Sequence, residues 1–346
     1  MLPSQIYTTQ QNRAIADSAS TRTRVKKIRS QWITLKVPAT TCNIGPGLDT
    51  VALALNAYST VTLELLPQEN MAIPMVQLRG DIKTSSDHQS VGDLVYSIMR
   101  KVCLTRRPLL HRIKILIESD LPLNRGLGVS DSLILAALFA INAIEDCVLS
   151  QADLLHQCNA LEAQPECVAA SLLGDLVISA PAYQSNRVSV QQMHWPADWH
   201  LLCVVPSYSL TTPSMRMAIP EQLPKKDVTH NLQHLALFLA AVANRNDQAM
   251  KEALDDRLHE AYRLSFVPAL KSLRAHLKAL PVIGCVLSGA GPSVLVICNK
   301  NHKELINTSI LDWISKHGEP HKLLDLQCDR QGMVDLTSSY RQNLRA

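Results

Sequence analysis

The chain has 346 residues, enough for about two ordinary domains, and 47% of them are apolar, which suffices for a sizeable core. Its net charge of +4 and the lack of a dense basic block beyond the N-terminus argue against a nucleic-acid surface, and no apolar run is long enough to span a membrane. Nine scattered cysteines with no Cys-x-x-Cys pair favour free thiols in a reducing compartment over a disulfide or zinc framework.

Residues 1–31 are predicted to form a flexible N-terminal extension. They are polar, contain six basic residues against one acid, and show no sustained apolar period. An organelle-targeting segment is the alternative that this composition leaves open, whereas the lack of an apolar centre argues against a secretory signal. We expect a cytoplasmic protein unless this segment directs it to an organelle.

The folded part is predicted to start at Trp32 with a β-strand, because apolar and polar residues alternate from Ile33 to Val37. The loop at 38–49 follows and contains a Gly-Pro-Gly sequence, which is typical of a turn. A second extended segment over 51–65 begins as a continuous apolar run and ends in alternation. The pattern predicts two strands joined by this loop.

The segment 122–132 lies between an alternating strand at 113–117 and an almost wholly apolar helix at 133–144. Its two close glycines allow a tight turn, and the first N–H groups of a helix, together with the helix dipole, suit an anion. Either Ser130 or Ser132 is suited to cap the helix, and Ser130 is also suited to ligate a phosphate-bound magnesium ion. The alternative is an ordinary tight turn with a serine cap. It is not a Walker A loop, because no Gly-Lys-Ser/Thr is present.

The rest of the chain divides where its composition loosens over 185–198, and we expect a domain boundary near residue 185. Before it we expect an amphipathic helix at 91–103 and an apolar segment at 154–173. After it we expect strands at 201–205, 281–286 and 294–298, a helix at 231–243, and a Gly-rich turn at 287–293 between the last two strands.

Three motifs resemble signatures of the GHMP kinases, the superfamily of galactokinases, homoserine kinases, mevalonate kinases and phosphomevalonate kinases. The segment 122–132 resembles the phosphate loop Pro-x-Gly-x-Gly-Leu-Gly-Ser-Ser-Ala, and 287–293 resembles the third signature. The first signature of homoserine kinases, Val-Pro-Ala-Thr-x-x-Asn-Leu-Gly-Pro-Gly-Phe-Asp, matches at Pro38, Ala39, Thr40, Asn43, Gly45, Pro46, Gly47 and Asp49. The resemblance covers about 32–335 and indicates homoserine kinases as the nearest branch.

This resemblance implies an α+β, two-domain GHMP kinase fold. The N-terminal, ATP-binding domain, expected at 32–185, would be similar to ribosomal protein S5 domain 2. The C-terminal domain, expected at 186–346, would be ferredoxin-like. A homodimer is the expected assembly, with no nucleic acid or membrane as partner.

The implied reaction transfers the γ-phosphate of ATP to the side-chain hydroxyl of L-homoserine, a step toward threonine. Asn43 and Arg216 would be catalytic, and Arg216 and Arg263, which match family positions, would grip the substrate carboxylate. The substrate would contact Asn43, Asp49, Thr212, Arg216 and Arg263. ATP would contact Pro122, Asn124, Arg125, Gly126, Leu127, Gly128, Val129, Ser130 and Ser132. Mg2+ would be held by Ser130 and Glu162. The alternative for Asn43 and Asp49 is that they only brace their loop.

Several residues depart from the family pattern. Asn124 stands where glycine is usual, Val129 where serine is usual, and Asp131 where alanine is usual. The sequence at 164–167 is Gln-Pro-Glu-Cys in place of His-Pro-Asp-Asn. These departures leave two alternatives open: a relative that lost kinase activity and serves in binding or regulation, and a kinase for a related small alcohol. For Asp131 we expect that its carboxylate turns out of the phosphate loop, to cap backbone N–H groups or to face solvent.

Overall fold

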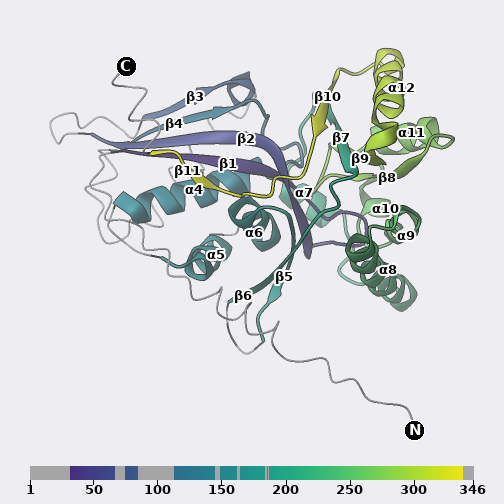
Figure 1. Ribbon diagram of the computed structural model, residues 1–346, viewed down its shortest axis with the longest axis horizontal. Helices are drawn as coiled ribbons and strands as arrows, with labels where there is room; N and C mark the ends of the chain where they lie inside the picture. The colour runs from purple at the N-terminus through teal and green to yellow at the C-terminus, as the bar shows by residue number, and fades with distance from the viewer. Residues whose placement is uncertain are drawn as a thin grey trace, which may run out of the picture.

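The computed structural model describes residues 32–66, 75–84, 113–144, 149–161, 164–183, 185 and 187–337 (Figure 1). The predicted extension at 1–31 and the predicted helix at 91–103 lie outside the described residues. Figure 1 shows two sheets, each covered by helices, with the first sheet at the left and the second at the right.

The first sheet has seven strands. Their order is β11-β1-β2-β4-β3, and β5 pairs with β2 on one side and β6 on the other. The strands are β1 (Trp32–Cys42), β2 (Val51–Leu65), β3 (Met75–Arg79), β4 (Ile113–Ser119), β5 (Leu176–Pro181), β6 (Val188–Met193) and β11 (Val334–Asp335). A 3-10 turn, η1 (Asp81–Thr84), follows β3. All pairs are antiparallel except β3 with β4.

Strand β2 belongs to two parts of this sheet. Its C-terminal half pairs with β4 and its first three residues pair with β5. The register of β1 with β2 shifts between Pro38 and Ala39, as at a β-bulge, which bends strands. The predicted strands at 32–37, 51–65 and 113–117 are confirmed, and the first continues to Cys42. The loop at 43–50 therefore starts beyond the bulge.

Three helices cover one face of the first sheet: α4 (Val129–Ile144), α5 (Gln151–Ala160) and α6 (Pro165–Leu173) (Figure 1). Helix α4 is confirmed where the apolar run predicted it, and its described residues from Leu133 to Leu138 are all buried. The apolar segment predicted at 154–173 divides into α5 and α6. Pro165 begins the second helix, at a position where its missing N–H costs no hydrogen bond.

The second sheet has the order β10-β7-β9-β8 and is antiparallel throughout. Its elements follow the chain as β7 (Trp199–Pro206), α11 (Pro268–Leu277), β8 (Val282–Leu287), β9 (Val294–Asn299), α12 (Lys303–Lys316) and β10 (His321–Leu326). This β-α-β-β-α-β succession is the ferredoxin-like arrangement. The predicted strands at 201–205, 281–286 and 294–298 are confirmed.

Four helices are inserted between β7 and α11. They are α7 (Thr212–Met217), α8 (Lys225–Asn244), α9 (Asp247–Ala253) and α10 (Glu260–Arg263), and a 3-10 turn, η2 (Lys300–His302), precedes α12. The helix predicted at 231–243 is the C-terminal part of α8. Among the helices that the structure describes, none is long and apolar enough to cross a membrane.

The predicted domain division at residue 185 stays a prediction. Strand β6 pairs with β5 and so extends the first sheet to Met193, which favours a division slightly later in the chain. Strand β11 then returns to pair with β1, so the first domain also contains residues from the end of the chain. We propose that the chain crosses between the domains twice.

Candidate active site

The three motif loops, 38–49, 122–132 and 287–293, meet at one place between the two sheets. The Thr40 N–H donates to Leu127 O at 3.0 Å, and the Gly289 N–H donates to Cys42 O at 2.9 Å. The Ser288 hydroxyl donates to Gly126 O at 2.7 Å. A pocket lies at their junction, lined by residues of all three loops and by the N-terminal ends of α4, α6 and α7. We call it the junction pocket.

We call the segment 122–132 before and at the start of α4 the glycine loop. Its backbone is left-handed at three positions. The φ angles of Asn124, Gly126 and Gly128 are +55°, +73° and +59°. A Cβ atom on Gly128 would lie 1.9 Å from Thr40 Oγ1, and one on Gly126 would lie 2.1 Å from Ser288 O. Both glycines are therefore required by the packing of the motif loops. Asn124 departs from the family pattern without changing the backbone, because asparagine tolerates the left-handed region better than most residues.

Arg125 fixes the glycine loop to the second domain. Its Nε donates to Pro206 O at 3.1 Å and its Nη2 donates to Ser207 O at 2.6 Å, at the end of β7. Its Nη1 donates to Leu123 O at 3.0 Å within the loop itself. The guanidinium is buried. We therefore propose that the predicted contact of Arg125 with ATP is made through its backbone.

The two serines at the start of α4 differ in their surroundings. Ser132 is buried, and its hydroxyl lies 2.9 Å from Pro38 O and 3.0 Å from Gly128 O. The structure thus uses Ser132 to brace the motif loops, and we propose this role in place of a phosphate contact. Ser130 instead lines the junction pocket, together with Pro122 and Val129. Ser130 is the serine placed to face a ligand there.

Asp131 caps the neighbouring helix α6. Its Oδ1 accepts a hydrogen bond from the N–H of Gln164, the residue that precedes α6, at 3.0 Å. The expected capping of a backbone N–H is seen at Gln164, but Asp131 also lines the junction pocket, so its turning out of the phosphate loop stays a prediction. Burial raises the pKa of Asp131 to about 6, against the lowering effect of that hydrogen bond and of the nearby Arg216 charge.

Asn43 and Asp49 lie in one tight loop. Both have left-handed backbones, with φ angles of +57° and +50°, and the Asp49 N–H donates to Asn43 Oδ1 at 2.8 Å. This is the bracing contact that the sequence left open as an alternative. The Asp49 carboxylate also forms an ion pair with Arg216 Nη2 at 2.9 Å, and both side chains are about half exposed. Two residues predicted to bind the substrate thus bind each other here.

Arg263 lies deeper in the same region. It is buried, its Nε donates to Met215 O at 3.2 Å, and its Nη1 lies 3.1 Å from His259 Nδ1. Burial is the largest influence on the pKa of this guanidinium and lowers it. Thr212, the remaining predicted substrate contact, lines the junction pocket at the start of α7. The structure brings Thr212, Arg216 and Arg263 to one side of the site.

A buried network behind Arg263 was not predicted. His259 Nε2 lies 2.9 Å from Gly45 O in the first motif loop, which requires the Nε2–H tautomer if Nδ1 accepts from Arg263. Asp256 accepts from the N–H groups of His259 and Glu260, at 2.9 and 2.7 Å. Of the segment 256–263, the sequence predicted a role for Arg263 alone, although His259 and Asp256 lie in the same segment. This network positions Arg263 against the Gly-Pro-Gly turn.

The Gln-Pro-Glu-Cys segment places Gln164 and Cys167 in the wall of the junction pocket and buries the carboxyl group of Glu166 close to the thiols of Cys42 and Cys167. Glu166 is 1% exposed, and burial, with added repulsion from Asp49 and Asp131, raises its pKa to about 7. Cys167 lines the junction pocket beside Cys42 of β1. Glu162, predicted as a magnesium ligand, lies outside the described residues. The sequence predicted a site role for Glu162 but not for Glu166, Cys167 or Cys42.

Comparison with known proteins identifies both halves of the chain. The family profile "GHMP kinases N terminal domain" matches residues 93–179, and the profile "GHMP kinases C terminal" matches residues 238–310. The chain is similar to solved structures of a homoserine kinase from Cytophaga hutchinsonii (TM-score 0.75, 20% identity, 89% of this chain and 98% of that one) and a mevalonate diphosphate decarboxylase from Staphylococcus aureus (TM-score 0.65, 14% identity, 88% and 98%). The predicted two-domain GHMP kinase fold is confirmed.

Two relatives show that the similarity is nearly full-length. A homoserine kinase from Leuconostoc mesenteroides is 34% identical over 303 residues, which cover 87% of this chain and 98% of the relative. One from Desulfitobacterium hafniense is 29% identical over 304 residues, with the same two coverages. The chain belongs to the homoserine kinase family of the GHMP kinases.

Proposed function

We propose that this protein is an ATP-dependent phosphotransferase that phosphorylates the side-chain hydroxyl of L-homoserine. The observation that carries this proposal is the Asp49–Arg216 ion pair near the start of α4, where the Arg216 charge acts on the Asp131 carboxyl. The glycine loop at the start of α4 suits a nucleotide, and the Asp49–Arg216 ion pair suits a zwitterionic amino acid. The near full-length similarity to homoserine kinases supports the same assignment.

The glycine loop and α4 would hold the phosphates of ATP. Helix α4 has 16 residues, and its first N–H groups have no partner within the helix, so they and the helix dipole attract an anion. The contacts that we assign to ATP are those of Pro122, Asn124, Arg125, Gly126, Leu127, Gly128, Val129 and Ser130.

Ser130 lines the pocket, and its hydroxyl is the kind of hard oxygen ligand that Mg2+ prefers. We propose that Ser130 and Glu162 hold the ion, which supplies charge neutralisation for the phosphates when bound. This assignment leaves the glycine loop free to orient the nucleotide through its backbone alone.

The Asp49–Arg216 pair would open to admit the amino acid. The substrate ammonium would replace Arg216 at Asp49, while the substrate carboxylate would take Arg216, with Arg263 and Thr212 completing its surroundings. Both charges of the pair are half exposed, so their mutual attraction is worth only about 0–1 kcal/mol and is readily exchanged. Each charge of the protein would thus keep a partner in the complex.

Transfer would rest on positioning, because phosphoryl transfer demands little covalent chemistry from a protein. The Oδ1 of Asn43 is bonded to the Asp49 N–H, so we assign its Nδ2 group to the substrate hydroxyl. Arg216 would then serve both the carboxylate and the orientation of the hydroxyl toward the γ-phosphate. The hydroxyl proton would pass to the phosphate itself, since we assign no catalytic base.

Other properties follow from this assignment as proposals. Homoserine as substrate places the reaction in threonine biosynthesis, and the seven cysteines among the described residues, all unpaired, agree with a reducing compartment such as the cytoplasm. A homodimer stays a prediction. The departures at Asn124 and Asp131 are both accommodated without closing the glycine loop, so neither residue favours the alternative of an inactive relative.

A coupled ADP-release assay tests the proposal. Full-length protein with MgATP is offered L-homoserine and, in parallel, a panel of other amino alcohols and simple alcohols. We expect ADP release that depends on homoserine and yields O-phosphohomoserine, identified by mass spectrometry. Faster turnover with another alcohol would change the substrate assignment, and nucleotide binding without turnover on any of them would favour the inactive relative.

A further inference from the structure

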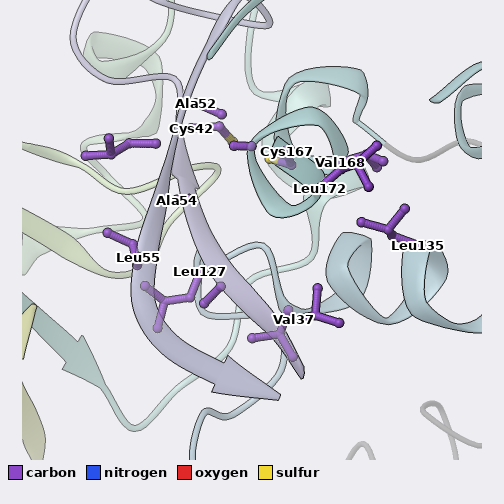
Figure 2. Packing of buried hydrophobic residues seen from close by; sticks show 14 of the residues in the cluster. Val37, Cys42, Ala52, Ala54, Leu55, Leu127, Leu135, Cys167, Val168 and Leu172 are labelled. Carbon is purple, nitrogen blue, oxygen red and sulfur yellow. The ribbon is translucent and has the colours of Figure 1, made fainter. Parts of the chain in front are cut away.

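Three side chains of the Gln-Pro-Glu-Cys region and strand β1 form a compact group. The Sγ atoms of Cys42 and Cys167 and a carboxylate oxygen of Glu166 all lie within 4.8 Å of one another. The three residues are 4%, 1% and 1% exposed. Figure 2 shows the two thiol side chains reaching toward each other between β1 and α6. We call this group the thiol–carboxylate cluster.

Glu166 is not explained by packing alone. Its Oε1 atom is buried and has no hydrogen-bond partner among the described residues. A buried polar atom left without a partner destabilises the fold, and a charged one does so more strongly. The nearby carboxylates of Asp49 and Asp131 add repulsion. A cation between Glu166 and the two thiols would remove both penalties.

We propose that Cys42, Cys167 and Glu166 bind a zinc ion, or another divalent ion of the same preference for sulfur. In a tetrahedral zinc site the ligand atoms lie about 3.5–3.8 Å apart, so small side-chain shifts would bring this cluster onto one ion. Binding exchanges the two thiol protons, and the carboxyl proton where present, for the ion. Two thiolates also exclude Mg2+, which prefers oxygen ligands.

A fourth ligand is already in position. The side-chain oxygen of Gln164 accepts from Cys42 Sγ at 3.4 Å and from Cys167 Sγ at 3.7 Å, so it faces both thiols. The N-terminus of α6 lies beside the cluster. The site would use two cysteines, one carboxylate and one amide oxygen.

Bound zinc would lie in the wall of the junction pocket, because Cys42, Gln164 and Cys167 line that pocket together with the glycine loop. We therefore expect the ion to compete with nucleotide or substrate and to inhibit turnover. The binding itself does not depend on the kinase activity proposed above, so it can be measured even if that activity is absent.

The test is a titration of the reduced, metal-free, full-length protein with Cd2+, followed by the ultraviolet band of cadmium bound to thiolates. We expect saturation at one equivalent, and displacement of the band by Zn2+ but not by Mg2+. This band reports sulfur ligation only, so it ignores the separate group of His230, His234 and Asp255, which would complicate zinc stoichiometry. Calorimetry with Zn2+ then gives the affinity.

Variants decide whether the cluster is the site. Cys42→Ala and Cys167→Ala should weaken Cd2+ binding at least a hundredfold, and Glu166→Gln, which nearly preserves shape, at least tenfold. Cys158→Ala removes another buried thiol of the same domain and should leave binding unchanged. Circular dichroism checks that each variant is folded, and Glu166→Gln remains informative if a cysteine variant is not.

Three results would overturn the proposal. The first is the absence of a thiolate band with reduced protein, and the second is an unchanged affinity for Cd2+ in folded Glu166→Gln. The third is a spontaneous Cys42–Cys167 disulfide, seen as the loss of two hydrogens by mass spectrometry, in a chain whose reduced form binds neither ion. That last result would make the two thiols a redox pair instead.

Discussion

Helices α4 and α6 both begin at the wall of the junction pocket, but their first turns are built in opposite ways. The start of α4 presents backbone, behind a loop whose glycines at 126 and 128 leave no room for a Cβ atom, and its first-turn acid, Asp131, accepts from the Gln164 N–H that precedes α6. The start of α6 presents side chains, with Glu166 and Cys167 in its first turn and Asp131 accepting from the N–H that precedes it. An external anion can use the first helix, whereas the second is already occupied by the chain's own acidic groups.

The difference teaches where each kind of ligand can bind. A helix N-terminus attracts anions only while its N–H groups and dipole are not already neutralised. The Asp131 carboxylate does that at α6, and Glu166 adds an acidic group whose proton a cation can replace, so this end suits a cation better than phosphate. The N-terminal ends of α4 and α6, which both line the junction pocket, therefore select ligands of opposite charge.

The largest effect is expected when a Cβ atom is added to a glycine of the glycine loop. We expect Gly128→Ala to lower kcat/KM at least a thousandfold, about 4 kcal/mol, because the new Cβ would lie 1.9 Å from Thr40 Oγ1 on a left-handed backbone. Steady-state kinetics and the melting temperature measure this. Gly318→Ala is the matched control, since its Cβ would meet nothing within 4 Å. A Gly128→Ala enzyme within tenfold of the parent would contradict the backbone account.

The second prediction addresses the α6 end. The folded-state pKa of Glu166 is raised from 4.5 to about 7, so the folded protein keeps a proton that the unfolded chain releases. This contribution to stability is fully present below about pH 4.5 and is lost as pH rises through about 7.

Relative to Glu166→Gln, the free energy of unfolding of the parent should therefore fall by about 3 kcal/mol between about pH 4 and about pH 8. Urea unfolding across this range, with a chelator present to exclude metal ions, provides the measurement. If the difference between the two proteins stayed constant with pH, the Glu166 carboxyl would not be held protonated at the start of α6.

The third prediction concerns the binding of homoserine, which we assign to Arg216 and not to the start of α4 or α6. Arg216→Ala should raise the KM for homoserine about ten- to a hundredfold, about 1.4–2.8 kcal/mol, while the KM for ATP changes less than threefold. Stability should hardly change, because the Asp49–Arg216 pair is half exposed. Arg79→Ala, which breaks a similarly exposed pair with Glu118, is the control for both quantities. Equal effects on the two substrates would argue against Arg216 as the carboxylate contact.

The smallest effect is expected at Asp131, which connects the two helices. Asp131→Asn keeps an acceptor for the Gln164 N–H, so the Kd for MgATP should change by less than tenfold, about 1.4 kcal/mol. Calorimetry at one ionic strength compares the two proteins. Tightening by orders of magnitude would mean that the carboxylate acts on the phosphates, and the contrast between the two helix starts would no longer hold.

The sequence predicted the fold well where its patterns were local. Alternating and apolar runs located β1, β4, α4 and the strands of the second sheet, because each buries one face or all of its surface. The order of the three motifs then identified the family. The division at 185 was harder, since β6 has no buried run of its own and β11 joins the first sheet only through pairing across most of the chain.

The site was predicted less completely than the fold. Asn43, Asp49, Arg216 and Arg263 were selected by their place in motifs, and the structure brings them together. The bracing contact of Asn43 with Asp49 was an alternative that the sequence offered, but the Asp49–Arg216 ion pair could not be predicted, since the spacing of residues does not say which side chains meet. The sequence did not indicate His259 or Asp256 for the same reason. His259 contacts Gly45 O, far away in the chain, and Asp256 accepts from the backbone N–H of His259.

The sequence by itself determined the left-handed turns of the phosphate loop, because glycines such as Gly126 and Gly128 adopt positive φ angles at no steric cost. Tertiary structure alone decided the chemistry at the start of α6. Cys42 and Cys167 are 125 residues apart and their spacing predicts no metal site, yet the packing of α6 on β1 places their sulfur atoms within 4.8 Å of each other and of Glu166. Local conformational preference acts within a few residues, whereas burial and charge depend on what the fold brings into contact.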